Sequence, residues 1–349
     1  MPVVYPSSVN STTNARSRTV SKDEPWSRDQ PRLAVDRPLD SIEASWYYRS
    51  GNGRRCNRNR RQDTEVGPRM NTADFDTHVE NINRDGYTVL PGMLTRDECD
   101  AAQAELVRLS ADKDRGGLEC LFNKARVFER VYQIPDLLCV IRHFLGPDAI
   151  LSTTDGSILE PGKGGGGLHA DGALTGHLQP SSQAAADSAL RITSHAMGLN
   201  TIFCISDFNL TNGATRLMPG SHACESIEIP QTASDQARIA VAERGSTIVF
   251  NTNTWHGPSE NRSTQNRYAV LATWRRSWEK APYEMSRIVN PDVLERAGDE
   301  GGVMFGVEML PPYLERWQWD QDGRAKAGVR RSQARLATVR NGRPPPTTG

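Results

Sequence analysis

From residue 149 onward, the sequence alternates between short apolar segments and turns rich in Gly, Pro and Asn. Short runs of β-branched and aromatic residues between such turns predict strands rather than helices. Many short strands in succession usually close into a sandwich or barrel. The predicted fold class is therefore mainly β, a double-stranded β-helix of the jelly-roll or cupin-like type. We expect its strands near residues 149–159, 168–173, 197–206, 214–218, 246–251 and 267–275.

Helices precede the strands and are expected to buttress the β fold. Apolar spacing predicts a short helix over about residues 74–85, and residues 87–90 then predict a strand. Thr95 and Glu98 have the spacing of a capping box, which marks the start of the next helix. A further helix is expected at 135–145, opened by proline and ended by glycine. The buried face of the second helix is expected to hold Cys99, Ala102, Leu106 and Leu109.

Both ends of the 349-residue chain are polar and basic, and we predict disordered tails on either side of one domain. Residues 1–70 carry 13 basic and 8 acidic side chains, and residues 321–349 carry 7 and 1. The domain between them, 71–320, carries 22 basic and 33 acidic side chains, which argues against specific nucleic-acid binding. We interpret the arginine-rich stretch 49–61 as part of a solvated tail and not as a targeting or nucleic-acid-binding arm. Met70 directly precedes the first patterned segment and is an alternative start.

Cysteine usage and hydropathy indicate the compartment. The six cysteines form no C-x-x-C pair, which fits neither a zinc knuckle nor a disulfide framework. No apolar run approaches the roughly 20 residues that span a bilayer, and the N-terminus lacks the apolar region of a secretory signal. We therefore expect a cytoplasmic protein without a membrane partner. The sequence does not indicate its oligomeric state.

The motif His169-Ala170-Asp171 follows a run of four glycines. Side chains alternate along a strand, so His169 and Asp171 would lie on one face and Ala170 on the other. An imidazole and a carboxylate side by side provide two corners of a 2-His-1-carboxylate metal site, which leaves one face of the metal open. By itself, a His-x-Asp motif is more often a surface pair or a hydrogen-bonded core histidine.

Two later residues strengthen the metal hypothesis. His256 is expected at the end of an apolar strand, 87 residues beyond His169, a separation that strand pairing in a jelly roll readily closes. Arg267 opens the last predicted strand. An arginine there is usually a surface charge, but inside a barrel it needs an anion, and its planar fork suits a carboxylate.

Together these residues resemble the phytanoyl-CoA dioxygenase family of Fe(II)/2-oxoglutarate oxygenases. The resemblance covers about residues 74–320, and the block 207–222 looks most like that of members acting on small natural products. The matching segments, in order, are Asp85-Gly86-Tyr87-Thr88-Val89-Leu90-Pro91-Gly92, His169-x-Asp171, Asn212-Gly213-Ala214-Thr215, Pro219-Gly220-Ser221-His222, His256 and Arg267.

The resemblance implies a role for each matching residue. His169, Asp171 and His256 would hold Fe(II), and Arg267 would pair with the distal carboxylate of 2-oxoglutarate. Thr215 would add a hydroxyl donor near this co-substrate. The reaction would consume O2, release succinate and CO2, and hydroxylate or desaturate a small-molecule substrate.

Two positions refine this implication. Halogenating relatives have a small residue in place of Asp171, so the carboxylate here implies hydroxylation or desaturation. Many relatives carry glutamine three residues before the first histidine, where this chain has Gly166, so one contact to 2-oxoglutarate would be missing or replaced by water.

Three other functions stay open. They are a non-catalytic jelly-roll protein that binds a small molecule, a metal-dependent cupin isomerase, and an acyl-CoA hydroxylase of the same family. The complete triad and Arg267 favour an oxygenase over the first two. The acidic domain weakly disfavours acyl-CoA, whose phosphates attract basic patches.

Overall fold

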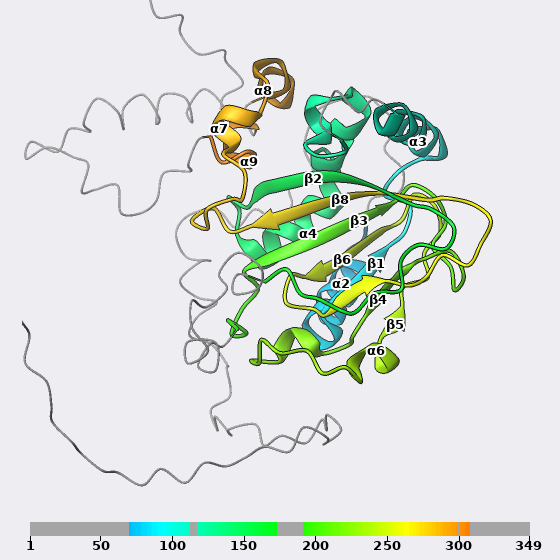
Figure 1. Ribbon diagram of the computed structural model, residues 1–349. Helices are drawn as coiled ribbons and strands as arrows, with labels where there is room; N and C mark the ends of the chain where they lie inside the picture. Colours follow the sequence, from blue (N-terminus) through cyan, green and yellow to red (C-terminus); the bar gives the residue numbers. More distant parts are fainter. Residues whose placement is uncertain (1–69, 112–116, 173–190, 299–300, 308–349) are drawn as a thin grey trace, which may run out of the picture. The chain divides into compact units, whose positions relative to one another are not determined.

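The computed structural model describes residues 70–111, 117–172, 191–298 and 301–307 (Figure 1). All of these residues belong to one compact unit of the chain. The two predicted tails therefore fall outside the described residues, apart from Met70. Within the described part, no helix is both long enough and apolar enough to cross a bilayer.

Two antiparallel sheets form the centre of the domain. One has five strands in the order β1-β6-β3-β8-β2, and the other has three in the order β5-β4-β7. The prediction of a mainly antiparallel β fold with added helices is confirmed. The strands are β1 (Tyr87–Leu90), β2 (Ile150–Leu159), β3 (Gly198–Cys204), β4 (Thr215–Leu217), β5 (Arg238–Ile239), β6 (Thr247–Asn251), β7 (His256–Pro258) and β8 (Arg267–Arg275).

Side-chain alternation along the strands gives the large sheet an inner and an outer face. On β8, Ala269 and Leu271 belong to a cluster that also holds Leu217 of the small sheet. Val270 and Trp274 lie on the other face of β8. They belong to a second, larger cluster, which also contains side chains of the helices. The two sheets therefore face each other across the first cluster, and the helices cover the opposite face of the large sheet.

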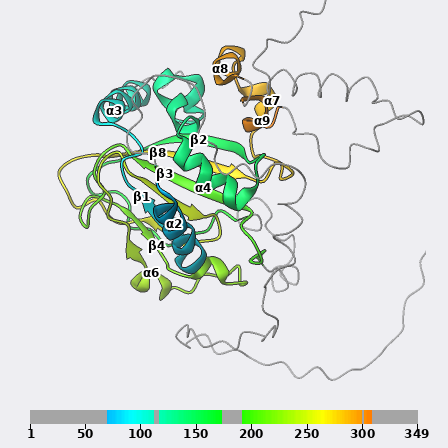
Figure 2. The same ribbon diagram turned by 180° about the vertical axis from the view of Figure 1, so that it is seen from behind.

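The three helices that the sequence predicted ahead of the strands are present. Figure 2 shows α2 and α4 lying across the large sheet. The capping box is formed at α3, because the Thr95 backbone N–H donates to Glu98 Oε2 at 2.8 Å and the Glu98 N–H donates to Thr95 Oγ1 at 3.2 Å. The four residues predicted for the inner face of α3 are its buried residues. The helices are α2 (Thr72–Asp85), α3 (Arg96–Ala111), η2 (Leu121–Asn123), η3 (Arg126–Tyr132), α4 (Pro135–Leu145), η4 (Ser221–Ala223), α6 (Ala233–Gln236), α7 (Met285–Ile288), α8 (Pro291–Ala297) and α9 (Gly301–Met304).

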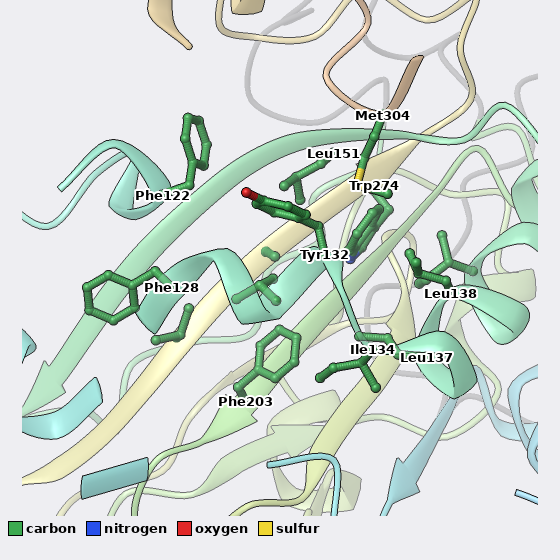
Figure 3. Close-up of a cluster of buried hydrophobic side chains, with 14 of the residues drawn as sticks. Phe122, Phe128, Tyr132, Ile134, Leu137, Leu138, Leu151, Phe203, Trp274 and Met304 are labelled. Carbon is green, nitrogen blue, oxygen red and sulfur yellow. The ribbon is translucent and has the colours of Figure 1, made fainter. Parts of the chain in front are cut away.

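Aromatic side chains join the helices to the outer face of the large sheet. Figure 3 shows Phe122, Phe128 and Tyr132 from η2 and η3 gathered over Phe203 and Trp274 of the strands. Phe305, which follows α9, packs on Phe122 and Tyr132 with ring centroids 5.2 Å apart in both cases. The C-terminal helices are thus part of the same core, and that core holds the large sheet rigid behind the inner face.

Two details differ from the predicted strands. The segment expected to form a strand at 168–173 makes only an isolated bridge, between His169 and His256, and residue 173 lies outside the described part. A continuous ladder is interrupted because residues 251–254 form a turn, in which the Thr254 N–H donates to the Asn251 carbonyl at 2.8 Å. His256 consequently begins the short strand β7 instead of ending the strand before it.

Candidate metal centre

The isolated bridge places two histidines directly opposite each other. The His169 N–H donates to the His256 carbonyl, and the His256 N–H donates to the His169 carbonyl, both at 2.8 Å. Such a reciprocal pair holds two residues of neighbouring antiparallel segments at close range. Their imidazole centroids are 4.2 Å apart. Backbone pairing alone thus fixes the spacing of the two rings.

Asp171 completes a three-residue cluster. Its backbone N–H donates to the Thr252 carbonyl at 2.8 Å, which keeps the segment extended beyond His169. Its Oδ1 lies 3.6 Å from His169 Nε2, and its Oδ2 lies 3.4 Å from His256 Nε2. One donor atom from each residue lies within 4.8 Å of the other two. The structure therefore brings together the three residues that the sequence singled out.

The protonation states of the cluster suit a divalent metal. Burial, together with the neighbouring His256, lowers the pKa of His169, so that its ring is neutral near pH 7. Burial opposes the charge on Asp171, but contacts with His256, His169 and Asn200 outweigh it and hold the pKa of the carboxyl below its usual value. Two imidazoles and one carboxylate form a donor set suited to Fe(II).

The tautomer of His256 follows from a backbone contact. Its Nδ1 lies 2.9 Å from the Thr254 carbonyl oxygen, which can only accept, so Nδ1 carries the proton. Nε2 is therefore the nitrogen left to bind a metal, on the side of Asp171. A ligand histidine is commonly oriented by such a bond from its other nitrogen.

One side of the cluster is open. The side chain of His256 is only 9% exposed, whereas those of His169 and Asp171 are 57% and 41% exposed. A metal held by these groups would be enclosed on the side of β7 and accessible on the other. That asymmetry leaves room for a co-substrate and a substrate on one face.

The glycine run before His169 lies against the chain that follows His256. The Gly162 N–H donates to the Asn261 carbonyl at 2.7 Å, and the Asn261 N–H donates to the Lys163 carbonyl at 2.8 Å. Gly164 has φ +90°, and a Cβ there would lie 2.3 Å from the Ser259 carbonyl oxygen. Glycine is thus required for close approach at position 164. At Gly166 an added Cβ would meet nothing within 4 Å, so the position where relatives carry glutamine is open.

Asn200 and Thr273 support the carboxylate of Asp171, and the sequence analysis did not identify either residue. Asn200 on β3 donates its Nδ2 to Asp171 Oδ2 at 2.7 Å. Its own Oδ1 accepts from Thr273 Oγ1 on β8 at 3.0 Å. The only sequence signal was an asparagine on a strand that is mostly apolar.

Arg267 lies at the start of β8 on the inner face of the large sheet, as predicted, and it is 4% exposed. Its guanidinium carbon lies 4.7 Å from the centre of the Phe208 ring. Its Nε is buried and has no hydrogen-bond partner among the described residues. Burial lowers the pKa of Arg267 to about 10. A buried cation in this state fits an incoming carboxylate such as that of 2-oxoglutarate.

Thr215 is buried on β4. It pairs with Pro258, and Leu217 two residues later pairs with His256. Alternation therefore places the side chains of Thr215 and His256 on the same face of the small sheet. Its predicted contact with a co-substrate stays a prediction.

The fold and the cluster define a jelly-roll protein of two facing antiparallel sheets with a candidate 2-His-1-carboxylate centre. Residues 82–269 match the phytanoyl-CoA dioxygenase (PhyH) family, and this segment makes up more than half of the chain. The chain belongs to that family, as its sequence motifs predicted, and is therefore an oxygenase.

Named relatives agree with this assignment. The chain is 24% identical over 255 residues to "Dioxygenase af480" of Aspergillus fumigatus, which covers 65% of this chain and 76% of the relative. It is 32% identical over 116 residues to "Dioxygenase cdmD" of Talaromyces verruculosus, covering 33% and 35% of the two chains.

The chain also resembles solved structures. The non-haem alpha-ketoglutarate-dependent epimerase SnoN from nogalamycin biosynthesis superimposes with a TM-score of 0.46 at 17% identity. The likeness covers 59% of this chain and 84% of the SnoN chain. A second SnoN structure, at 15% identity, holds Fe3+, alpha ketoglutarate and a nogalamycin compound.

Proposed function

We propose that this protein is an Fe(II)- and 2-oxoglutarate-dependent oxygenase that hydroxylates or desaturates a small organic molecule, with release of succinate and CO2. The observation that carries the proposal is the reciprocal bridge between His169 and His256, with the carboxylate of Asp171 within 3.6 Å of both Nε2 atoms. Membership of the family supports the same function.

The ligands would be His169, Asp171 and His256. When bound, iron supplies the activation of O2 that is coupled to oxidative decarboxylation of 2-oxoglutarate. The protein's part is to present two imidazoles and one carboxylate on a single side. The exposed side of the cluster then receives the co-substrate and the substrate.

Arg267 would bind the distal carboxylate of 2-oxoglutarate through its planar fork. The cation is already desolvated and held against Phe208, so little ordering remains when the anion arrives. Thr215 would donate its hydroxyl to the same co-substrate. Because Asp171 occupies the third ligand position, the reaction would be hydroxylation or desaturation, not halogenation.

The test combines metal content with a product assay. The full chain, reconstituted anaerobically with Fe(II), should bind one iron per chain and form succinate from 2-oxoglutarate once O2 is admitted. His256→Ala and Asp171→Ala should each lose both properties. His195→Ala is the matched control, because His195 is exposed and outside the cluster. One iron per chain and undiminished succinate formation in His256→Ala would refute the proposal.

A further inference from the structure

Two arginines of the described chain share an unusual environment. Arg191 and Arg267 are only 5% and 4% exposed. Among the described residues, no partner is found for Nε of Arg267 or for Nε and Nη2 of Arg191. Burial lowers the pKa of both guanidinium groups. A buried cation without an anion is costly, and a protein retains one chiefly where an anion binds.

Arg191 is held firmly in this environment. Its Nη1 donates to the Asn253 carbonyl at 3.0 Å, and its backbone N–H donates to the Glu225 carbonyl at 2.8 Å. Its guanidinium carbon lies 5.6 Å from the centre of the Trp255 ring. Asn253 in turn donates its Nδ2 to the Ile192 carbonyl at 2.8 Å. One nitrogen of the fork is therefore fixed, and the other two are buried with no partner among the described residues.

The segment that holds Arg191 also supports the metal cluster. Asn253 follows Thr252, whose carbonyl accepts the backbone N–H of Asp171. A Cβ added to Gly172 would lie 1.9 Å from Asn253 Oδ1, so the chain just after Asp171 is packed on Asn253. Trp255 directly precedes the ligand His256. Arg191 is thus bound to the short stretch of chain between the contacts of two metal ligands.

We propose that Arg191 binds an oxyanion, a carboxylate or a phosphate, that belongs to the organic substrate. This inference rests on the proposed function, in which Arg267 is already assigned to 2-oxoglutarate. A carboxylate and a phosphate share the geometry that matches two adjacent guanidinium nitrogens. Anchoring at Arg191 would fix one end of the substrate and so limit which of its carbons reaches the cluster.

The binding test uses small probes and the full chain. With Fe(II) and saturating 2-oxoglutarate under anaerobic conditions, hexanoate, hexyl phosphate and hexanol are titrated by calorimetry. One of the two anions should bind at one equivalent, and the neutral alcohol should not. The anion that binds more tightly identifies the source of the oxyanion. Absence of binding by either anion would overturn the proposal.

Substitutions assign that binding to Arg191. Arg191→Gln should weaken the preferred anion at least tenfold while 2-oxoglutarate binding stays within twofold. Arg191→Lys, which keeps the charge without the fork, should fall in between and serves if the glutamine variant is unstable. Arg238→Gln is the matched control, since Arg238 is an exposed arginine on β5. Equal affinity in the wild type and in Arg191→Gln would contradict the proposal.

Two further variants test whether Arg191 is paired within the chain and whether it acts separately from Arg267. Asp187 is the only acidic residue between 173 and 190. If wild type binds no probe but Asp187→Asn binds one, Arg191 has an internal partner and the proposal is wrong.

Arg267→Gln should lose 2-oxoglutarate binding and keep the anion affinity. If 2-oxoglutarate fails to bind the wild type while the anion still binds through Arg191, the proposed function fails and the oxyanion site stands.

Discussion

Asn200 and Asp171 are joined by a hydrogen bond of 2.7 Å from the side-chain amide of the first to Oδ2 of the second. Asn200 lies opposite Thr273 in the pairing of β3 with β8, and their side chains are also bonded. The rotation of the carboxylate is therefore set by the large sheet, although Asp171 itself lies on a segment outside the named strands.

The first prediction concerns this support. Asn200→Leu should weaken Fe(II) binding about 10- to 100-fold, because a metal ligand that loses its orienting partner binds less well. Fe(II) affinity is measured anaerobically by competition with a chelator, and the thermal midpoint is measured in parallel. Thr273→Val, which removes only the outer bond, should have a smaller effect. Unchanged iron affinity in Asn200→Leu would show that the carboxylate needs no such support.

The second prediction concerns Arg267. Removing the charged partner of a desolvated carboxylate costs about 2–5 kcal/mol, so Arg267→Ala should raise the 2-oxoglutarate concentration needed for half-maximal decarboxylation at least tenfold. Iron binding should be retained. Arg267→Lys should recover the affinity only in part. The control is Arg262→Ala, which removes an exposed arginine. If Arg267→Ala has the 2-oxoglutarate requirement of the wild type, another residue anchors the co-substrate.

The third prediction concerns the pH dependence of stability at His222. Its Nε2 lies 3.2 Å from the Asn83 carbonyl oxygen, and a Cβ on Gly86 would lie 2.6 Å from its Nδ1. Burial lowers the pKa of His222, although the Asn83 contact and Asp85 favour the protonated ring. The unfolded chain therefore takes up the proton first as pH falls.

It follows that the contribution of His222 to stability is complete above the unfolded pKa, about 6.5, and is lost progressively below it. The free energy of unfolding should fall more in wild type than in His222→Gln between about pH 7 and about pH 5. Denaturant titrations at a series of pH values measure this difference. Parallel pH profiles for the two proteins would contradict it.

The fourth prediction concerns domain boundaries. We propose that residues 70–322 are sufficient for folding and activity, because the polar ends of the sequence offer little apolar surface to offset the entropy of ordering, about 1–2 kcal/mol per residue. The truncated chain should match the full chain in thermal midpoint, iron content and 2-oxoglutarate decarboxylation. A midpoint several degrees lower, or loss of most activity, would show that a terminal segment contributes to the domain.

Local sequence patterns allowed three helices and the closeness of His169 and Asp171 to be predicted. The capping box involves only Thr95 and Glu98, which are three residues apart. The buried face of α3 follows from apolar residues that recur every three or four positions. His169 and Asp171 are two residues apart, so strand alternation was enough to place their side chains together. Arg267 was singled out because an arginine inside a barrel needs an anion and because it matches the family pattern after His256.

Other features depend on contacts between distant segments. The strands β5 and β7 have two and three residues, too few for a periodic signal. The hydrogen bond between Asn200 and Asp171 joins residues 29 positions apart. The residues next to Asn200 in the sequence do not indicate this bond. Arg191 is one of many arginines in the sequence, and only its burial against Asn253 and Trp255 distinguishes it.

The order of the ligands along the chain has a consequence for synthesis. His169 and Asp171 leave the ribosome long before His256, and the turn that precedes His256 is tied to the start of the domain, since the Asn251 N–H and Thr254 Oγ1 both donate to the Gly86 carbonyl. A nascent chain that ends at β3 therefore has two of the three ligands and lacks their partner. The proposed ligand set is therefore complete only after translation has passed residue 256, and iron cannot be held by all three groups before that point.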